Sequence, residues 1–121
     1  MSQDTELTDA GRIAASYFES WRTKDFATFR SLLADDVTFD GPLGTAANAE
    51  ECVRGIEGMS KIVTDIVVHK IFVSGDDVLT WFDLHTEHAP PCPTANWSQL
   101  RDGRIARIRV AFDPRPLVSD S

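Results

Sequence analysis

The side chains in this sequence with the clearest chemical potential indicate acid–base chemistry rather than metal or redox chemistry. A neutral histidine at position 69 could take a proton from a carbon acid, and the Tyr17 hydroxyl could stabilise the resulting oxyanion. Asp40 precedes a Gly-Pro break and is a second candidate base. Cys52 and Cys92 lie in no CxxC motif or Cys/His cluster, so we expect two reduced thiols, no metal and no cofactor.

A second group of ionisable residues alternates along one segment. Asp83, His85 and Glu87 resemble a catalytic constellation when the chain is read linearly. Alternate residues of a strand share one face, so the three point into a pocket together or away from it together. Their role therefore depends on which face of the strand is buried.

The first half of the chain has helical periodicity. Ile13, Tyr17 and Trp21 recur at intervals of four, which predicts an amphipathic helix over residues 8–23. Asp25 can cap a second short helix that runs to Asp35 and Asp36. Asn48 followed by Glu51 resembles a capping box, which predicts a third helix over residues 48–59.

The second half is typical of antiparallel strands. After a strand over 37–40, which Gly-Pro-Leu-Gly at 41–44 ends, we expect two hairpins. One joins 65–74 to 77–88 through Gly75-Asp76, and the other joins 96–101 to 104–112 through Asp102-Gly103. Helices followed by a meander predict an α+β fold, in which three N-terminal helices pack on one face of a curved, mostly antiparallel sheet.

Length and charge limit the possible partners. The 121 residues suit one domain, residues 1–121, and a formal charge of -7 disfavours nucleic acid and anionic membranes. Residues 1–7 lack the pattern of a secretory signal, and no apolar run reaches the roughly 20 residues that span a bilayer. We therefore expect a soluble, cytoplasmic protein.

Three segments resemble one known family: YFESWRTKDF at 17–26, LADDVTFD at 33–40 and RDGRIARIRVAFD at 101–113. They are similar to the SnoaL-like polyketide cyclase branch of the nuclear transport factor 2-like superfamily, over about residues 10–113. The resemblance implies that the curved sheet is cone-like (a cone-like barrel of cystatin-like kind) and that it encloses a pocket. It leaves the reaction open, because the superfamily contains isomerases, epoxide hydrolases, dehydratases, cyclases and binding modules.

Counting outward from the two turns assigns the strand faces. From Asp102-Gly103, the set expected to face inward is Ala95, Trp97, Gln99, Ala106, Ile108, Val110 and Phe112. The set expected outside is Asn96, Ser98, Arg107 and Arg109. From Gly75-Asp76, one face holds Val67, His69, Ile71, Val73, Val78, Thr80, Phe82 and Leu84, and we expect it to be inner because the family's pocket positions fall on Phe82 and Leu84.

On this alignment the family's catalytic acids are missing. Phe82, Leu84 and Val110 stand at positions that match the Arg and two Asp residues of the related epoxide hydrolases, and Val110 also matches the essential Asp of the cyclases. Compared with ketosteroid isomerase, the helical Tyr is retained as Tyr17. The base aligns with Gly41, next to Asp40, and the second acid falls near Trp97.

We therefore expect a mostly apolar pocket with Tyr17, His69 and Asp40 as candidate catalytic residues. The indole N–H of Trp97 could help Tyr17 to stabilise an oxyanion. The expected ligand-contacting residues are Trp21, Phe39, Ile56, Met59, Thr80, Phe82, Leu84, Trp97, Gln99, Val110 and Phe112.

Three functions fit these residues. The first is an isomerase- or cyclase-type enzyme that transfers protons on a hydrophobic carbonyl compound of terpenoid or polycyclic kind. The second is a module that binds an apolar molecule without transforming it, and the third is a structural homodimer with a filled core. Each candidate also has a structural interpretation: Tyr17 and Trp21 as helix core, His69 as a core histidine, and Asp40 as a turn residue.

The outer sheet face suggests a homodimer. Leu79, Trp81 and Phe72 would lie there beside Asp83 and His85, and acids of one strand could meet Arg107 and Arg109 of a second copy. If the faces were reversed, Asp83 and His85 would become the leading catalytic pair. The tail at 114–118 would cover the mouth of the cone or the partner.

Overall fold

The structure is a computed structural model that describes residues 9–118. Within that range the order is α1 (Asp9–Thr23), α2 (Phe26–Ser31), β1 (Leu33–Gly41), β2 (Gly44–Ala46), α3 (Ala49–Met59), β3 (Val63–Ser74), β4 (Asp77–Thr86), β5 (Ala89–Arg101), β6 (Arg104–Ala111) and α4 (Arg115–Val118). The expectations for residues 1–7, and for Thr8 as the first helical residue, lie outside the described range.

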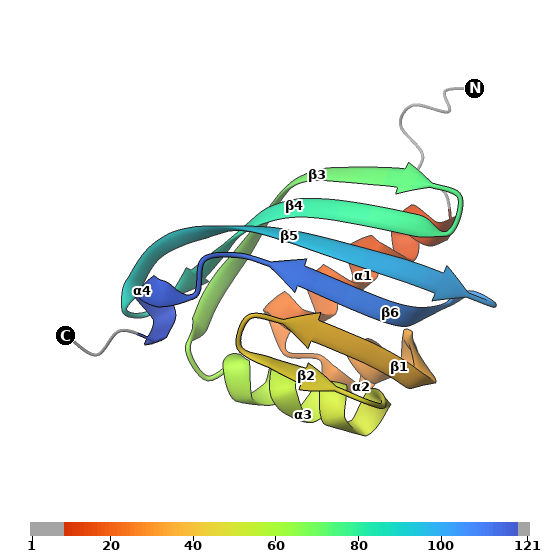
Figure 1. Cartoon of the computed structure of the whole chain (residues 1–121), viewed down its shortest axis with the longest axis horizontal. Coiled ribbons are helices and arrows are strands. Elements are labelled where there is room, and N and C mark those ends of the chain that lie inside the picture. The colour runs from red at the N-terminus through yellow and green to blue at the C-terminus, as the bar shows by residue number, and fades with distance from the viewer. Residues whose placement is uncertain (1–8, 119–121) are drawn as a thin grey trace.

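The described strands form one curved, unclosed sheet in the order β2-β1-β6-β5-β4-β3 (Figure 1). Neighbouring strands are antiparallel except β1 and β6, which run parallel. Helix α1 passes behind the long strands and packs on β3 and β4, whereas α3 packs on β1 and β2. The α+β class with N-terminal helices on one face of the sheet is confirmed.

Caps that were visible in the sequence fix the two helices that follow α1. Asp25 accepts a hydrogen bond from Thr28 N at the start of α2, and Asn48 Oδ1 accepts one from Glu51 N, 2.9 Å away, at the start of α3. Helix α2 ends at Ser31, before the Asp35-Asp36 pair, because β1 already begins at Leu33.

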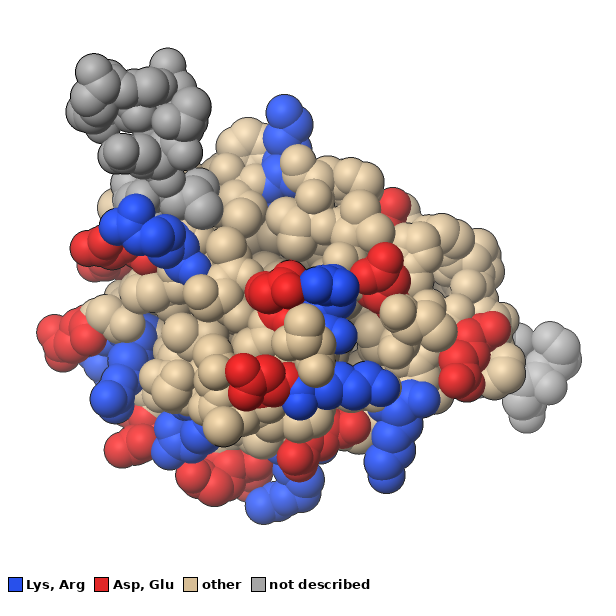
Figure 2. All heavy atoms as spheres, turned by 180° about the vertical axis from the view of Figure 1, so that it is seen from behind, with Lys and Arg blue, Asp and Glu red and all other residues tan. Residues whose placement is uncertain are grey.

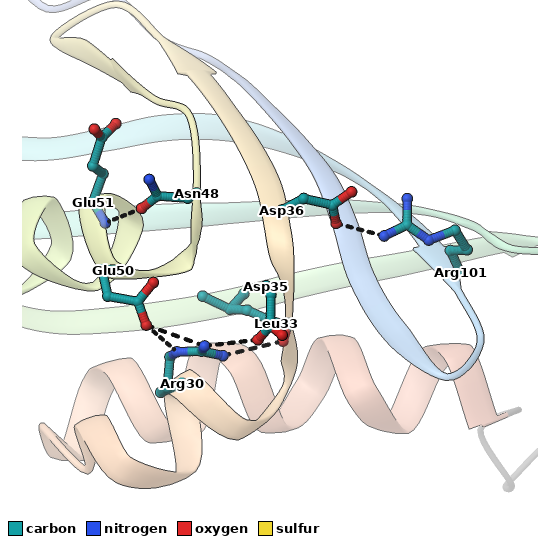
Figure 3. A network of polar contacts seen from close by, with 8 residues as sticks. All are labelled: Arg30, Leu33, Asp35, Asp36, Asn48, Glu50, Glu51 and Arg101. Atoms are coloured by element: carbon teal, nitrogen blue, oxygen red, sulfur yellow. Dashed lines mark hydrogen bonds and ion pairs between the residues drawn. The ribbon is translucent and has the colours of Figure 1, made fainter.

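Arg30 ties these elements together. Its guanidinium contacts Asp35 Oδ1 at 2.8 Å and Glu50 Oε2 at 3.1 Å, and so joins α2 to β1 and to α3 (Figure 3). Arg101, at the end of β5, likewise pairs with Asp36 of β1. Exposed pairs of this kind contribute little stability singly.

The apolar stripe of α1 forms the core with the inner face of β4. Tyr17, Phe18 and Trp21 are each at most 6% exposed, and the ring centroid of Phe18 lies 4.8 Å from that of Phe82. On β4, Val78, Thr80, Phe82 and Leu84 are buried. The expected inner face of β4 is therefore confirmed.

A bulge in β3 overturns the expected pairing of His69. Val73 pairs with Val78 and Ile71 with Thr80 as counted from the turn, but Val68, not His69, pairs with Phe82. The extra residue at His69 reverses the alternation beyond it, since a bulge inserts one unpaired residue. Ile66 rather than Val67 consequently takes the inner place opposite Leu84.

A bulge in β6 overturns the assigned faces of β5. Leu100 pairs with Ile105 as predicted, but Gln99 pairs with Arg107, which leaves Ala106 unpaired. As a result Asn96 and Ser98, expected outside, are buried, whereas Trp97 is 37% exposed. Ala95 and Gln99 share the outer face with Trp97, while Ile108 remains inside.

The hairpin turn that anchored this count was itself identified correctly. Asp102 and Gly103 have φ of 54° and 79°. Two positive φ values are the geometry of the tight turn that matches the twist of paired strands, and Asp-Gly favours it.

Charged residues are interspersed on the face seen from behind. Figure 2 shows acidic and basic side chains side by side there, with no large patch of one sign. Ion pairs such as Arg22 with Glu19 on α1 account for part of this mixing. Among residues 9–118, no helix combines the length and apolar character needed to cross a bilayer.

Candidate functional site

The helices and the inner face of the sheet enclose a cavity of about 160 Å³. Its wall is almost wholly apolar and includes five aromatic rings. The lining residues are Tyr17, Trp21, Phe39, Gly41, Pro42, Leu43, Gly44, Thr45, Ala46, Glu51, Cys52, Gly55, Ile56, Met59, Phe82, Leu84, Thr94, Asn96, Val110 and Phe112.

The exposure of the lining residues distinguishes the mouth of the cavity from its floor. The exposed lining residues belong to the β1–β2 turn and to α3, with Leu43 46% exposed. Tyr17 and Trp21 of α1, Phe82 of β4 and Asn96 of β5 are at most 6% exposed. The cavity therefore opens between the β1–β2 turn and α3, and its floor lies against α1.

Two hydrogen-bond donors at the floor lack partners. Tyr17 Oη and Trp21 Nε1 are buried, and neither forms a hydrogen bond with any described residue. Burial, and then nearby Cys52, raise the pKa of Tyr17 well above its ordinary value. The Asn96 side chain partly offsets this rise, although the two side chains fall short of hydrogen-bond geometry.

The two other ionisable residues of the described lining are Cys52 and Glu51, and of these only Cys52 is buried. Burial raises the pKa of the Cys52 thiol to about 12, so the thiol stays protonated. Glu51 is exposed at the mouth, where its Oε1 accepts a hydrogen bond from Ala47 N at 2.8 Å. Among the described lining residues, none is Lys, Arg or His.

This cavity, enclosed by N-terminal helices and a curved sheet, agrees with the family comparison. The family model that matches the chain is that of the SnoaL-like domain, over residues 14–108. The chain belongs to this family. No curated protein matches the sequence of this SnoaL-like domain significantly.

Solved structures show the same fold. A protein from Kribbella flavida DSM 17836 is 27% identical, with a TM-score of 0.82 and 88% of each chain covered. An NTF2-like protein of unknown function from Cytophaga hutchinsonii ATCC 33406 is 28% identical, with a TM-score of 0.79 and coverage of 97% of this chain and 100% of that one.

An epoxide hydrolase from M. tuberculosis shares the fold at 22% identity, with a TM-score of 0.75 and coverage of 87% of this chain and 83% of that one. The structures similar to this SnoaL-like domain include proteins assigned as isomerases, cyclases and epoxide hydrolases. The family thus establishes the fold, and the reaction must be argued from the cavity.

Most of the expected contact residues line the cavity of this SnoaL-like domain. Tyr17 is there, and so are Trp21, Phe39, Ile56, Met59, Phe82, Leu84, Val110 and Phe112. Thr80 faces inward and is buried, but it lies outside the lining.

Two of the three candidate catalytic residues lie elsewhere, so their expected position in the cavity is wrong. His69 is on the outer face, where Nε2 lies 3.0 Å from Asp83 Oδ2, and its side chain is 43% exposed. Asp40 is exposed and borders a shallow hollow on the outer face of the sheet. His69 lies on the outer face because of the bulge in β3. Asp40 points outward because the residues of β1 alternate between the faces, with Val37 buried and Phe39 half-buried on the inner one.

The expected second oxyanion donor is also outside. Trp97 Nε1 donates to Asp77 Oδ1 at 3.0 Å on the outer face, and Gln99 lies on that face as well. The bulge at Ala106 accounts for both residues. The indole donor of the cavity is instead Trp21, which the sequence identified only as a contact residue.

Sequence reasoning missed Asn96, Thr94 and Cys52 as lining residues. Asn96 and Thr94 were assigned to the wrong face or to none, because counting from the turn ignores bulges. Short polar residues at alternate positions, Asn96 and Ser98 in the strand predicted over 96–101 and Thr94 just before it, were an available signal for a polar inner strip. Cys52 lies one turn before Ile56 on α3 and could have been placed by periodicity.

Proposed function

We propose that this protein binds a small, neutral, apolar molecule in the cavity and does not transform it by proton transfer. The observation that carries the proposal is the content of the cavity floor: two buried hydrogen-bond donors and, among the described lining residues, no buried carboxylate, histidine, lysine or arginine, since the carboxylate of Glu51 lies exposed at the mouth. General acid–base catalysis needs a base within hydrogen-bond reach of the proton it removes.

The size of the cavity limits the ligand. An engineered apolar cavity of about 150 Å³ takes up benzene, and drug-sized ligands occupy pockets of roughly 300–1,000 Å³. A cavity of about 160 Å³ therefore fits a molecule of one ring. Polycyclic compounds are too large, which narrows the range of ligands that the sequence suggested.

Charge limits the ligand further. The lining combines the carboxylate of Glu51 at the mouth with no basic side chain among its described members, within a protein of net charge -7. An anion entering this cavity would lose its hydration without gaining a counter-ion. We therefore expect acetophenone to bind and benzoate to be rejected.

The experiment measures binding and chemistry on the same sample. Titration calorimetry with acetophenone should give saturable binding, and Ile56→Trp, which fills the cavity, should abolish it. At saturation, NMR should detect no protein-dependent exchange of the methyl protons of acetophenone for deuterium. Enhanced exchange that Ile56→Trp removes would establish an enzyme and overturn the non-catalytic part of the proposal; absence of binding would overturn the cavity as a ligand site.

A second proposal concerns the outer sheet face, on which two copies of the chain would associate. Phe72, Leu79 and Trp97 are directly paired across β3, β4 and β5, and each is 37–58% exposed. Trp81 adds a further half-exposed ring. Exposed apolar patches of this extent support a role in self-association.

Charge complementarity favours a second copy as the occupant. Arg109 pairs with Trp97 at the β6 end of the apolar row, with its guanidinium 6.0 Å from the ring centroid, and Arg107 follows on the same face. Asp83 lies on β4, farther along the strand than Leu79 and Trp81 and two strands away from Arg109. A two-fold axis through the middle of the face would bring acids of one copy toward arginines of the other.

Sedimentation velocity tests this association. The wild type should sediment as a dimer, and Trp81→Glu and Arg109→Glu should each give monomers. Leu43→Glu, at an equally exposed apolar residue beside the cavity mouth, serves as the matched control and should remain dimeric. A monomeric wild type, or variants with an unchanged sedimentation coefficient, would contradict the proposal.

A further inference from the structure

Three fully buried polar side chains connect β5 to the floor of the cavity. Ser98, Asn96 and Tyr17 are 2%, 1% and 1% exposed. Ser98 and Asn96 are two residues apart on β5, so they share its inner face, and Asn96 and Tyr17 both line the cavity. Buried polar groups are costly unless they are paired, so the direction of each hydrogen bond here has consequences.

The hydrogen bond between the two β5 residues orients the Asn96 amide. Ser98 Oγ donates to Asn96 Oδ1 at 2.9 Å. The carbonyl arm of the amide therefore faces Ser98, which leaves the NH₂ arm, a pure donor, for the other side. Asn96 lowers the pKa of Tyr17, which is the effect expected of an N–H directed at the phenol oxygen.

This arrangement determines what Tyr17 can do. The NH₂ arm of Asn96 forms no hydrogen bond with Tyr17, but it offers the phenol oxygen a donor and no acceptor, so Tyr17 keeps its hydroxyl hydrogen for a further acceptor. The indole Nε1–H of Trp21 is a donor by nature, and both groups are buried without a partner among the described residues. The unpaired groups at the floor are thus two donors, contributed by successive turns of α1.

We propose that Ser98 and Asn96 form a relay that holds Tyr17 as a hydrogen-bond donor, and that Tyr17 and Trp21 together select neutral ligands bearing an oxygen acceptor such as a ketone or aldehyde. The inference rests on the proposed binding function and names the ligand class of the same cavity. Tyr17 and Trp21 touch the ligand, whereas Asn96 and Ser98 are positioning residues.

Because the two donors are shielded from water, they favour ligands that carry a hydrogen-bond acceptor. Both polar atoms are closed off from water in the structure, so an acceptor reaches them only when neighbouring rings shift aside. A hydrocarbon fills the same apolar volume but leaves both donors unpaired. The ligand oxygen therefore gains hydrogen bonds that water does not already provide.

The test compares acetophenone with ethylbenzene, which has nearly the same shape but lacks the oxygen. The wild type should prefer the ketone by roughly three- to tenfold beyond the difference in their aqueous solvation, as one net hydrogen bond implies. Tyr17→Phe and Trp21→Phe should each reduce that preference, while ethylbenzene affinity stays within about twofold.

The relay is tested by Asn96→Asp, which keeps the shape but replaces the NH₂ donor with an acceptor. The hydroxyl of Tyr17 would then turn toward residue 96, so the ketone preference should fall as in Tyr17→Phe although the phenol is still present. Ser98→Ala, which frees the amide to rotate, should give a smaller loss. The same variants should raise the carbonyl stretching frequency of bound acetophenone, a shift that a purely structural role would not produce.

Each outcome has one meaning. If the wild type binds neither compound, the cavity proposal itself is overturned. Binding of both with an unchanged ketone preference in Tyr17→Phe would overturn the donor role alone. A folded Asn96→Asp that keeps the preference and the carbonyl frequency of the wild type would overturn the relay, and if that variant fails to fold, an unchanged carbonyl frequency in Ser98→Ala would do so.

Discussion

At the scale of single residues, the environment of each ionisable group decides its role more than its chemical type does. Tyr17 and Cys52 line the same cavity, and burial makes each of them harder to ionise. His69 and Asp83, a typical acid–base pair by type, form a hydrogen bond on the outer face. This acid–base pair and the cavity that could use it therefore lie on opposite sides of the sheet.

The raised pKa of Cys52 predicts a loss of stability at alkaline pH. The shift from 9.0 to about 12 favours the neutral thiol of the folded state. That contribution is complete below pH 9, where the unfolded thiol is also protonated, and is lost as the pH rises toward 12. Urea unfolding under reducing conditions should therefore show a steeper decline for the wild type than for Cys52→Ala, by roughly 2–3 kcal/mol at about pH 11.

Comparison of slopes separates this effect from the cavity that Cys52→Ala creates, because the cavity cost does not depend on pH. Tyr17 also has a raised pKa, and Cys52 contributes to that rise, so the loss of stability due to Tyr17 is smaller in Cys52→Ala and adds to the difference in slope in the same direction. Parallel curves for the two proteins would mean that the thiol ionises as readily in the folded state as in the unfolded chain.

At the scale of elements, α3 forms one wall of the cavity and is weakened by glycine. Gly55 lies inside Ala49–Met59, and a Cβ added there would meet no atom within 4 Å. Gly75 has the same free space but a φ of +62°, in the left-handed region that L residues avoid. The two positions differ in backbone conformation and not in crowding.

Gly55→Ala should therefore stabilise the protein by roughly 0.5–1 kcal/mol, because alanine loses less entropy in a helix. Gly75→Ala, the matched control, should destabilise it by about 1 kcal/mol or more because of its backbone conformation. Chemical denaturation of both variants measures the two changes in the free energy of unfolding. Equal effects of the two substitutions would contradict the conformational explanation.

The same scale separates what the sequence could predict from what it could not. Helical periodicity placed Tyr17 and Trp21 correctly because α1 is regular throughout. Strand alternation placed Phe82 and Leu84 correctly, since β4 itself contains no extra residue. It failed for His69, which is itself the extra residue of a bulge, and for Trp97, whose face was inferred from pairs with β6 that the extra residue Ala106 shifts.

At the scale of the whole molecule, two hollows lie back to back. Gly41 and Val110 line both the cavity and the shallow hollow on the outer face. A Cβ at Gly41 would meet the Phe39 ring at 3.0 Å, so a larger residue there would require the ring to shift by a few tenths of an ångström. The wall between the ligand site and the proposed dimer face is therefore a single layer of β1 and β6.

Thermal unfolding of the whole chain should report both proposed partners. Acetophenone at about one hundred times its Kd should add about 2.7 kcal/mol, which raises the Tm by on the order of 10 °C for a chain of this size. The Tm should also rise with protein concentration, because dissociation accompanies unfolding of a dimer. Benzoate at the same concentration is the negative control, and an equal rise with benzoate would contradict the charge argument.

The bulges at His69 and Ala106 have a broader consequence for how such proteins diverge. Inserting one residue into a strand reverses the alternation beyond it, so that later side chains move from the interior to the surface or from the surface to the interior. Evolution can thus replace the entire polar content of a binding chamber without substituting any of the residues that end up in it. In this fold, residues that are aligned in sequence can lie on opposite faces of the sheet. Catalytic residues should therefore be assigned only after the bulges of each protein have been located.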